Sequence, residues 1–320
     1  MALLTLLDVA KRNGSDAVVG LIDETSKAFP EITGRTYLGA REIVLPNVAA
    51  ARTIQGTHYK TLVRTGLPTV AFRSANEGVV ESKASYENRL VETFILNPRW
   101  GADKAVADRS EDGPEAMIAD DADAHMQAAF LTLARQFYYG ATAQGDLKGY
   151  PGLMQSHDAA NMVVDAGGTT ADTGSSVWLV KFGPKDVQWV WGNNGQLQLS
   201  EVELRDKSDA DGNKFTAYHQ ELNAYPGLQA VSLRGICRIK KLTADAGKGL
   251  TDALIADALS KFAAGVVPDV IFASRRSIKQ LRASRTATNA TGAPAPFPEE
   301  AFGIPIAPTD SILDTEALTL

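Results

Sequence analysis

The sequence has one cysteine, four scattered histidines and no apolar run long enough for a membrane span. The single thiol, Cys237, has no partner for an intrachain disulfide, which favours a reducing cytoplasm as its setting. The apolar start MALLTLLDVA is interrupted by Asp8, and its positive charges, Lys11 and Arg12, follow the run instead of preceding it as in a signal peptide. We therefore expect no membrane partner. The start instead predicts an amphipathic segment with these residues on one helical face: Leu3, Leu6, Leu7 and Ala10.

The usual catalytic motifs are also missing: there is no phosphate-binding glycine loop, no nucleophile elbow and no HExxH metal motif. Asp121 and His125 are one helical turn apart, but no third ligand has matching spacing, so an ion pair is favoured over a metal site. The adjacent residues 156–158, Ser-His-Asp, cannot align as a catalytic triad. The stretch DADGNK at 209–214 lacks the glycine and the glutamate of a calcium loop, which favours a polar hairpin tip. The sequence predicts no catalytic residue, no metal site and no cofactor.

Charge narrows the class of partner further. The net charge of −6 argues against a dedicated nucleic-acid binder, but it is compatible with a protein that encloses nucleic acid without reading its sequence. One basic row lacks interleaved aromatic residues, so both a phosphate contact and an ion-pair face between subunits remain open for it. The row consists of Arg275, Arg276, Lys279, Arg282 and Arg285.

Three of the four tryptophans lie within residues 175–194. The apolar run 177–182 predicts a strand that is buried on both faces, and Gly-Pro-Lys-Asp at 183–186 predicts a turn. We expect a hairpin with its second strand at 187–191, followed by a strand over 197–204. Its aromatic residues alternate with Val and Leu instead of with Arg or Lys, which favours a sheet core over a stacking platform. The core residues predicted here are Trp178, Trp189 and Trp191.

The remaining pattern predicts an α+β protein. A helix of about 25 residues, roughly 37 Å long, is expected over 114–139, with Pro114 in its first turn and Gly140 at its end. A second helix is expected at 251–264 with Thr251 as its cap. A buried strand at 270–273, Ser274 as N-cap and a basic helix follow, and a short strand begins near residue 304.

The N-terminal 53 residues have too few apolar groups for a core of their own, and the next segment is mostly basic. Two strand-like runs within residues 53–78 flank Thr65-Gly66-Leu67-Pro68, which predicts a hairpin with its turn there. A two-stranded hairpin is marginally stable in water, so a projecting one needs a partner surface. Residues 90–96 predict a strand that returns to the body.

The order of these stretches resembles the tailed-phage major capsid proteins of the Hong Kong 97 fold. The similarity is carried by QFYYGATAQGDLKGYPGLM, by the tryptophan-rich stretch with DADGNKFTAYHQELNAYPGLQAVSLRGICRI after it, and by GTHYKTLVRTGLPTVAFRSANEGVVES. It implies an N-terminal arm (1–53), an extended loop (54–84), a peripheral domain with the spine helix (85–150) and an axial domain (151–232). It also implies a peripheral-domain return strand (233–248), and an axial-domain and C-terminal segment (249–320).

The resemblance implies a structural subunit that assembles through pentamers and hexamers into an icosahedral shell enclosing the double-stranded DNA of a tailed bacteriophage. Its localisation would be the virion capsid, after assembly in the host cytoplasm. Implied partners are other copies of the chain, a separate scaffolding protein and a portal, and the sequence leaves open whether decoration proteins bind as well. Some members of this family form covalent lysine–asparagine cross-links. Lys60 and Lys83 lie in or near the loop, but no motif identifies a partner asparagine, so no cross-link is predicted. The extended-loop residues expected to contact a neighbouring subunit are His58, Tyr59, Lys60, Arg64, Phe72 and Arg73.

Two alternatives remain open from the sequence. An encapsulin-like nanocompartment shell protein shares the fold, and would present an interior pocket for cargo peptides. A soluble α+β enzyme of undefined chemistry, with the tryptophan stretch lining a pocket, is the alternative from another class of protein. Electron microscopy separates them, because both shell proteins form closed particles and only the phage protein packages DNA.

Overall fold

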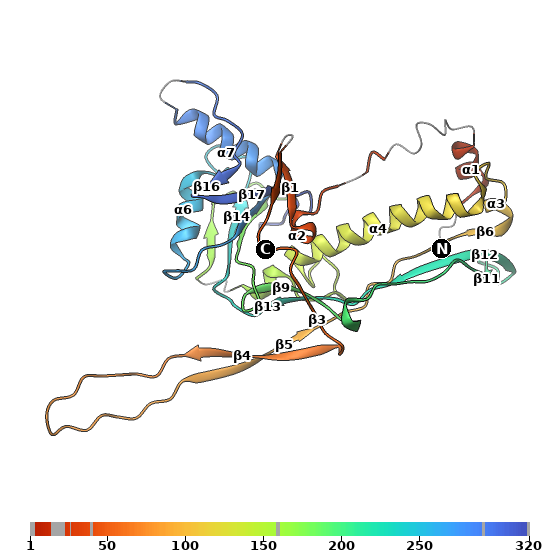
Figure 1. The fold of residues 1–320 in the computed structure, drawn as a ribbon. Coiled ribbons are helices and arrows are strands. Elements are labelled where there is room, and N and C mark those ends of the chain that lie inside the picture. Colours follow the sequence, from red (N-terminus) through yellow and green to blue (C-terminus); the bar gives the residue numbers. More distant parts are fainter. Residues whose placement is uncertain are drawn as a thin grey trace.

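A single long helix, α4 (Gly113–Tyr139), joins two sheet-containing parts of the molecule (Figure 1). Pro114 lies in its first turn, and Gly140 ends it with a φ of 57°. A Cβ at Gly140 would collide with the backbone of Gly152 and with the side chain of Gln155. The predicted helix and both of its ends are therefore confirmed. The computed structural model describes residues 4–13, 23–25, 27–38, 41–157, 161–289 and 292–318.

The C-terminal half of α4 packs on a six-stranded sheet. Along β8 (Ser175–Val180), Val177 and Leu179 face the cluster formed with helices α6 (Asp252–Ser260) and α7 (Arg275–Ala287), whereas Trp178 and Val180 face α4. The prediction of a strand buried on both faces is confirmed. The sheet has the order β16 (Glu300–Ala301), β17 (Ile304–Pro308), β15 (Val270–Ala273), β8 (Ser175–Val180), β14 (Ile236–Leu242) and β7 (Val163–Asp165).

The predicted caps of α6 and α7 are also present, with Thr251 accepting from the Leu254 backbone and Ser274 from the Ser277 backbone.

The N-terminal half of α4 covers a second sheet. Ile118 on the helix packs there with Trp100 and Leu222 of the sheet. Its strands are β6 (Arg99–Asp103), β12 (Lys214–Asn223), β11 (Glu203–Ser208) and β10 (Gln198–Leu199). The predicted polar hairpin tip lies between β11 and β12, where the Asp209 carboxylate accepts from the Asn213 backbone at 2.8 Å. Near the start of α4, the short helices α1 (Leu6–Arg12) and α3 (Lys104–Ala107) complete this part.

Smaller elements complete the body. A three-stranded sheet has the order β13 (Pro226–Ala230), β9 (Val187–Trp191) and β3 (Ala51–Thr53). A hairpin joins β1 (Arg35–Leu38) to β2 (Arg41–Val44), and short helices are α2 (Pro30–Thr33), α5 (Leu153–Ser156) and the 3₁₀ turn η1 (Asn193–Gly195). The last hairpin, β4 (His58–Gly66) with β5 (Ser85–Glu92), projects away from this body (Figure 1).

The predicted tryptophan hairpin is wrong in its pairing. β8 lies in the six-stranded sheet and β9 in the three-stranded one, and only Phe182 and Val187 form a bridge between the two runs. The Gly-Pro turn was recognised correctly, but it turns the chain out of one sheet and into another. The expected strand over 197–204 is also divided, into β10 and the start of β11.

Two segments pair differently from the expected domain assignment. We predicted that residues 233–248 would be a return strand of the peripheral domain. In the structure they contain β14, which lies between β8 and β7 in the six-stranded sheet. Conversely, β11 and β12 pair with β6 beside α4, although they fall within the expected axial segment 151–232. Both differences arise because strand partners far apart in sequence leave no local signal.

The predicted apolar face of the N-terminal helix is also wrong. Leu6 and Leu7 are 64% and 66% exposed, whereas Val9 is buried against Ala102 and Met117. A seven-residue helix contacts the body along one narrow line, so periodicity alone does not fix which residues make the contact. Leu3 and Asp158 lie outside the described residues.

Candidate functional site

The projecting hairpin exposes much of its surface, because most residues of β4 and β5 are exposed or half-buried. β4 and β5 pair antiparallel from His58 opposite Glu92 to Gly66 opposite Ser85. The turn predicted at residues 65–68 is therefore wrong, and the chain instead reverses near Asn76, whose φ is 69°. The hairpin also extends beyond the expected boundary at residue 84, because its second strand continues to Glu92.

The base of the hairpin is anchored to the three-stranded sheet. The Tyr59 hydroxyl donates to the side chain of buried Gln229, and the Arg52 guanidinium lies 4.2 Å from the centre of the Tyr59 ring. Partial burial raises the pKa of Tyr59, so its hydroxyl stays a donor at ordinary pH. Val91 packs with Val190 and Val231 in a small cluster at the same place. The hairpin therefore leaves the body in a fixed direction.

Many side chains of the hairpin are nevertheless exposed, although Val63 packs against the same cluster. Along β4, Tyr59 is half-buried, whereas His58, Lys60 and Arg64 are exposed. Phe72 is 109% exposed, which means that no other part of the subunit covers it. The exposed Arg73 guanidinium donates to the Glu77 carbonyl at 2.9 Å within the tip, and its contact with a neighbouring subunit stays a prediction. Large apolar side chains exposed on the hairpin also include Leu62, Leu67, Val70, Val80 and Tyr86.

A basic cavity of about 660 Å³ lies between the outer end of the paired strands, at residues 63–67, and the loop at 231–234. Arg64, Arg89 and Arg234 line it. Arg89 donates to the Val231 carbonyl and pairs with Glu87 at 3.6 Å, whereas Arg64 and Arg234 form no ion pair within the described part of the chain. The sequence did not indicate that Arg89 and Arg234 share this cavity with Arg64, because they are 25 and 170 residues away from it along the chain.

A second exposed surface accompanies the sheet under α4. Leu199 lies opposite Leu222, and Leu204 lies opposite Tyr218. Because Leu222 and Tyr218 pack in the cluster under α4, Leu199 and Leu204 lie on the same face of the sheet, at the outer edge of that face. They remain 57% and 53% exposed, and Leu197 and Val202 extend the same apolar strip. The adjoining first half of α4 is rich in carboxylates: Glu115, Asp120, Asp121 and Asp123.

The three tryptophans lie in or against the main core. Trp178 is fully buried, with the Arg238 guanidinium 5.2 Å from its ring centre. Trp189 stacks on Phe137 at 5.3 Å, and Trp191 is partly buried against the same cluster. None of the three lines a stacking platform at the surface.

Other candidates from the sequence are occupied by contacts within the chain. Three arginines of the basic row form ion pairs within the chain: Arg275 with Asp310, Arg276 with Asp314 and Arg285 with Asp252. Most of the row is therefore neutralised, which supports neither a phosphate contact nor an ion-pair face between subunits. The pKa of buried Cys237 is raised to about 12 by desolvation, which makes its thiol unreactive.

The His125 ring stacks on Trp100 at 5.4 Å. Within the described residues, no group of three potential ligands could hold a metal ion. Of the helices described, none is both long and apolar enough to cross a membrane.

Comparison with known proteins agrees with this architecture. The family model of major capsid protein GP7 matches residues 37–319. A structure of bacteriophage Epsilon15 is similar over 99% of this chain and 98% of that chain, with 22% identity and a TM-score of 0.71. The capsid of Myoviridae phage XM1 is similar over 72% of this chain and 98% of that chain, with 13% identity and a TM-score of 0.47. No curated protein sequence matches. Because the family model spans most of the chain and the fold is the Hong Kong 97 fold of phage capsids, the protein belongs to the GP7 family of major capsid proteins, and it is a structural subunit of the virion capsid and not an enzyme.

Proposed function

We propose that the chain assembles through pentamers and hexamers into an icosahedral shell that encloses the double-stranded DNA of a tailed phage, and that the β4–β5 hairpin makes the principal contact between subunits. The observation that carries this proposal is the exposure of the hairpin: its outer part presents large apolar side chains that its own body does not cover, and Arg64 on β4 forms no ion pair among the described residues. Such a surface is costly in water and indicates an interface.

The complementary surface is the first half of α4 with the apolar strip of Leu197, Leu199, Val202 and Leu204. The hairpin combines apolar side chains with Lys60 and Arg64, and the surface beside α4 combines apolar side chains with carboxylates. Opposite charges around a shared apolar contact favour one register of association and discourage like surfaces from meeting. A second copy of this chain would supply the acidic partner that Arg64 and Arg234 lack within the subunit. In a domain description, β6, β11, β12 and α4 would form the peripheral domain, and the six-stranded sheet with α6 and α7 the axial domain.

Carboxyl–amine cross-linking of an assembled mixture of ¹⁵N-labelled and unlabelled copies tests this contact. We expect mixed-label peptides that join Lys60 to the 111–123 segment, since a zero-length cross-link needs the amine and the carboxylate in direct contact. Cross-links confined to peptides of one label would contradict the contact. Lys240, which lies on β14 in the body, serves as the reference amine.

Separate scaffolding and portal proteins are part of the proposal, on the basis of the family alone. Expression with and without the neighbouring genes tests it. Regular closed shells from this chain alone would remove the need for a scaffolding protein.

A further inference from the structure

Glu31 is a carboxylic acid in the centre of the molecule. It lies on α2 in the N-terminal segment, and its side chain is fully buried. Its backbone carbonyl accepts a hydrogen bond from the Trp189 indole at 2.8 Å, so the residue lies directly against the main core. Burying a carboxylate without a cation is costly, so this position needs a physical explanation.

The carboxyl lies where three parts of the chain meet. The Thr309 hydroxyl, from the C-terminal segment, donates to one carboxyl oxygen at 3.2 Å. The second oxygen makes no hydrogen bond of ordinary geometry, and neither do the nearby hydroxyls of Tyr138 on α4 and Ser311. Tyr138 and Tyr150 are the titratable groups that influence this carboxyl, and burial raises the pKa of both phenols well above ordinary pH. No described residue forms an ion pair with Glu31, and nothing charged therefore balances its carboxylate.

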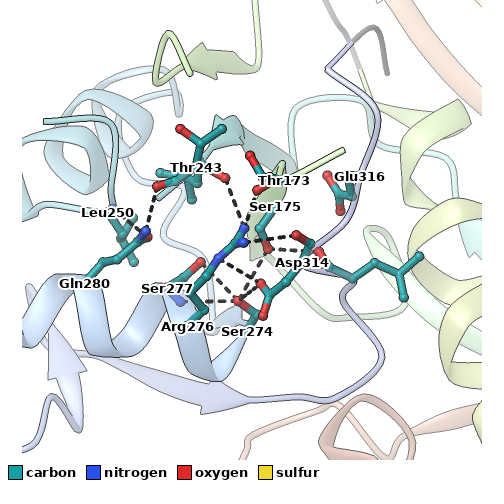
Figure 2. A network of polar contacts seen from close by, with 12 residues as sticks. Thr173, Ser175, Thr243, Leu250, Ser274, Arg276, Ser277, Gln280, Asp314 and Glu316 are labelled. Carbon is teal, nitrogen blue, oxygen red and sulfur yellow. Dashed lines mark hydrogen bonds and ion pairs between the residues drawn. The ribbon is translucent and has the colours of Figure 1, made fainter. Parts of the chain in front are cut away.

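The rest of the C-terminal segment is held differently. The Leu313 backbone donates to the Tyr139 hydroxyl at 2.8 Å. The Asp314 carboxylate accepts from Ser274 at 2.7 Å and pairs with Arg276 at 3.4 Å (Figure 2). Farther along, Glu316 pairs with buried Arg238 at 3.2 Å. Both of these carboxylates face a guanidinium. Glu31 is thus the one carboxyl around this segment, among the residues described, that lacks a compensating cation.

We propose that Glu31 is a proton-operated clasp, which holds the N-terminal segment, α4 and the C-terminal segment together when its carboxyl carries a proton and loosens them when the proton is lost. The protonated acid can donate to a neighbouring hydroxyl and leaves no net charge in the core. The ionised form places an unpaired charge among aromatic side chains. Both chain ends would respond together, because Glu31 contacts each of them.

The direction of the pH dependence follows from linkage. Burial raises the pKa of Glu31 from 4.5 to about 7. Below pH 4.5 the carboxyl is protonated whether the clasp is closed or open, and its full contribution to the closed state is present. Between pH 4.5 and about 7 the open state loses its proton first, so closure weakens about tenfold per pH unit. Above pH 7 the carboxyl is ionised in both states, so the opening constant stops rising, at about 300 times its value at low pH.

Hydrogen exchange of the full-length, unassembled subunit tests the clasp without depending on shell formation. After correction for the chemical exchange rate, the opening constant of amides at 31–34 and 309–313 should rise by on the order of 100-fold from pH 5 to pH 8. Glu31→Gln, which resembles the protonated acid, should show a flat profile. Glu42→Gln, on β2 in the same segment, should keep the wild-type profile because Glu42 is half-exposed and paired with Arg35.

A flat wild-type profile, or the same slope in Glu31→Gln, would overturn the proposal. If Glu31→Gln does not fold, ¹³C labelling of the glutamate carboxyls in the wild-type chain decides the question. A resonance that titrates near pH 7 and is coupled to the opening supports the clasp, and titration of every glutamate near pH 4.5 contradicts it. Failure of shell assembly with an intact pH profile would count against the proposed function and not against the clasp.

Discussion

Trp189 and Phe72 are both large aromatic residues, but their surroundings are opposite. Trp189 is 3% exposed and contacts Phe137 and Tyr150, whereas Phe72 lies beyond the body with no cover. In the free subunit only the first can contribute to the free energy of unfolding. Exposure of a large aromatic residue at a loop tip instead indicates a contact made after folding.

Trp189→Ala should lower the free energy of unfolding by about 3–5 kcal/mol, because it empties a large aromatic site and removes the indole donor to Glu31. Phe72→Ala, the matched control, should leave it unchanged. Denaturant titration of the unassembled subunit measures both. A Trp189→Ala protein of full stability would show that this residue is not part of the core packing.

The buried pair of Arg238 and Glu316 leads to a second residue-scale prediction. Their side chains are 4% and 3% exposed, so Glu316→Gln leaves a buried guanidinium without its carboxylate and should cost about 3–5 kcal/mol. Glu42→Gln removes the exposed partner of Arg35 and should cost about 0–1 kcal/mol. Equal losses in a denaturant titration would mean that the buried pair has no special role.

At the scale of elements, local patterns predicted what each segment forms but not what it pairs with. The ends of α4 were predictable because Pro114 and Gly140 act within one turn of the helix. The partner of β4 was not, because 18 polar and mixed residues separate it from β5, and Gly66-Leu67-Pro68 has the composition of a turn. The same limit explains β8 and β9, whose sheets depend on contacts with distant strands. Glu31 left no signal at all, since an isolated glutamate in a short polar stretch is typical of a surface.

The double reversal Arg64→Glu with Arg234→Glu should leave the melting temperature of the subunit nearly unchanged and block assembly. Both side chains are exposed and line the basic cavity, so their reversal repels the acidic surface expected from a neighbour. Arg73 is left unchanged in this variant, because its guanidinium donates to the Glu77 carbonyl within the hairpin tip and its reversal could disturb the tip itself.

Lys261→Glu with Lys279→Glu changes the net charge equally at exposed sites away from both the β4–β5 hairpin and the sheet beside α4, and it should assemble normally. Sucrose-gradient yields beside thermal melts measure each variant. Normal shell yield from the Arg64 and Arg234 variant would contradict the assigned interface.

At the scale of the whole molecule, α4 links a part built on the six-stranded sheet to a part built on β6, β11 and β12, and the hairpin projects beyond both (Figure 1). A net charge of −6 offers little attraction to DNA, so the fold suits a wall around a genome better than a reader of its sequence. Most of the exposed apolar side chains on the hairpin have no use in an isolated subunit. They become intelligible if neighbouring copies cover them.

Cryo-electron microscopy of particles assembled from this chain, expressed with its neighbouring genes, tests that claim most directly. We predict closed icosahedral shells with five- and six-membered rings, in which residues 58–92 of each subunit lie on the α4 surface of an adjacent copy. Monomers that stay unassembled at millimolar concentration with a protease-resistant hairpin would contradict the account. So would ordered shells in which the hairpin extends into solvent.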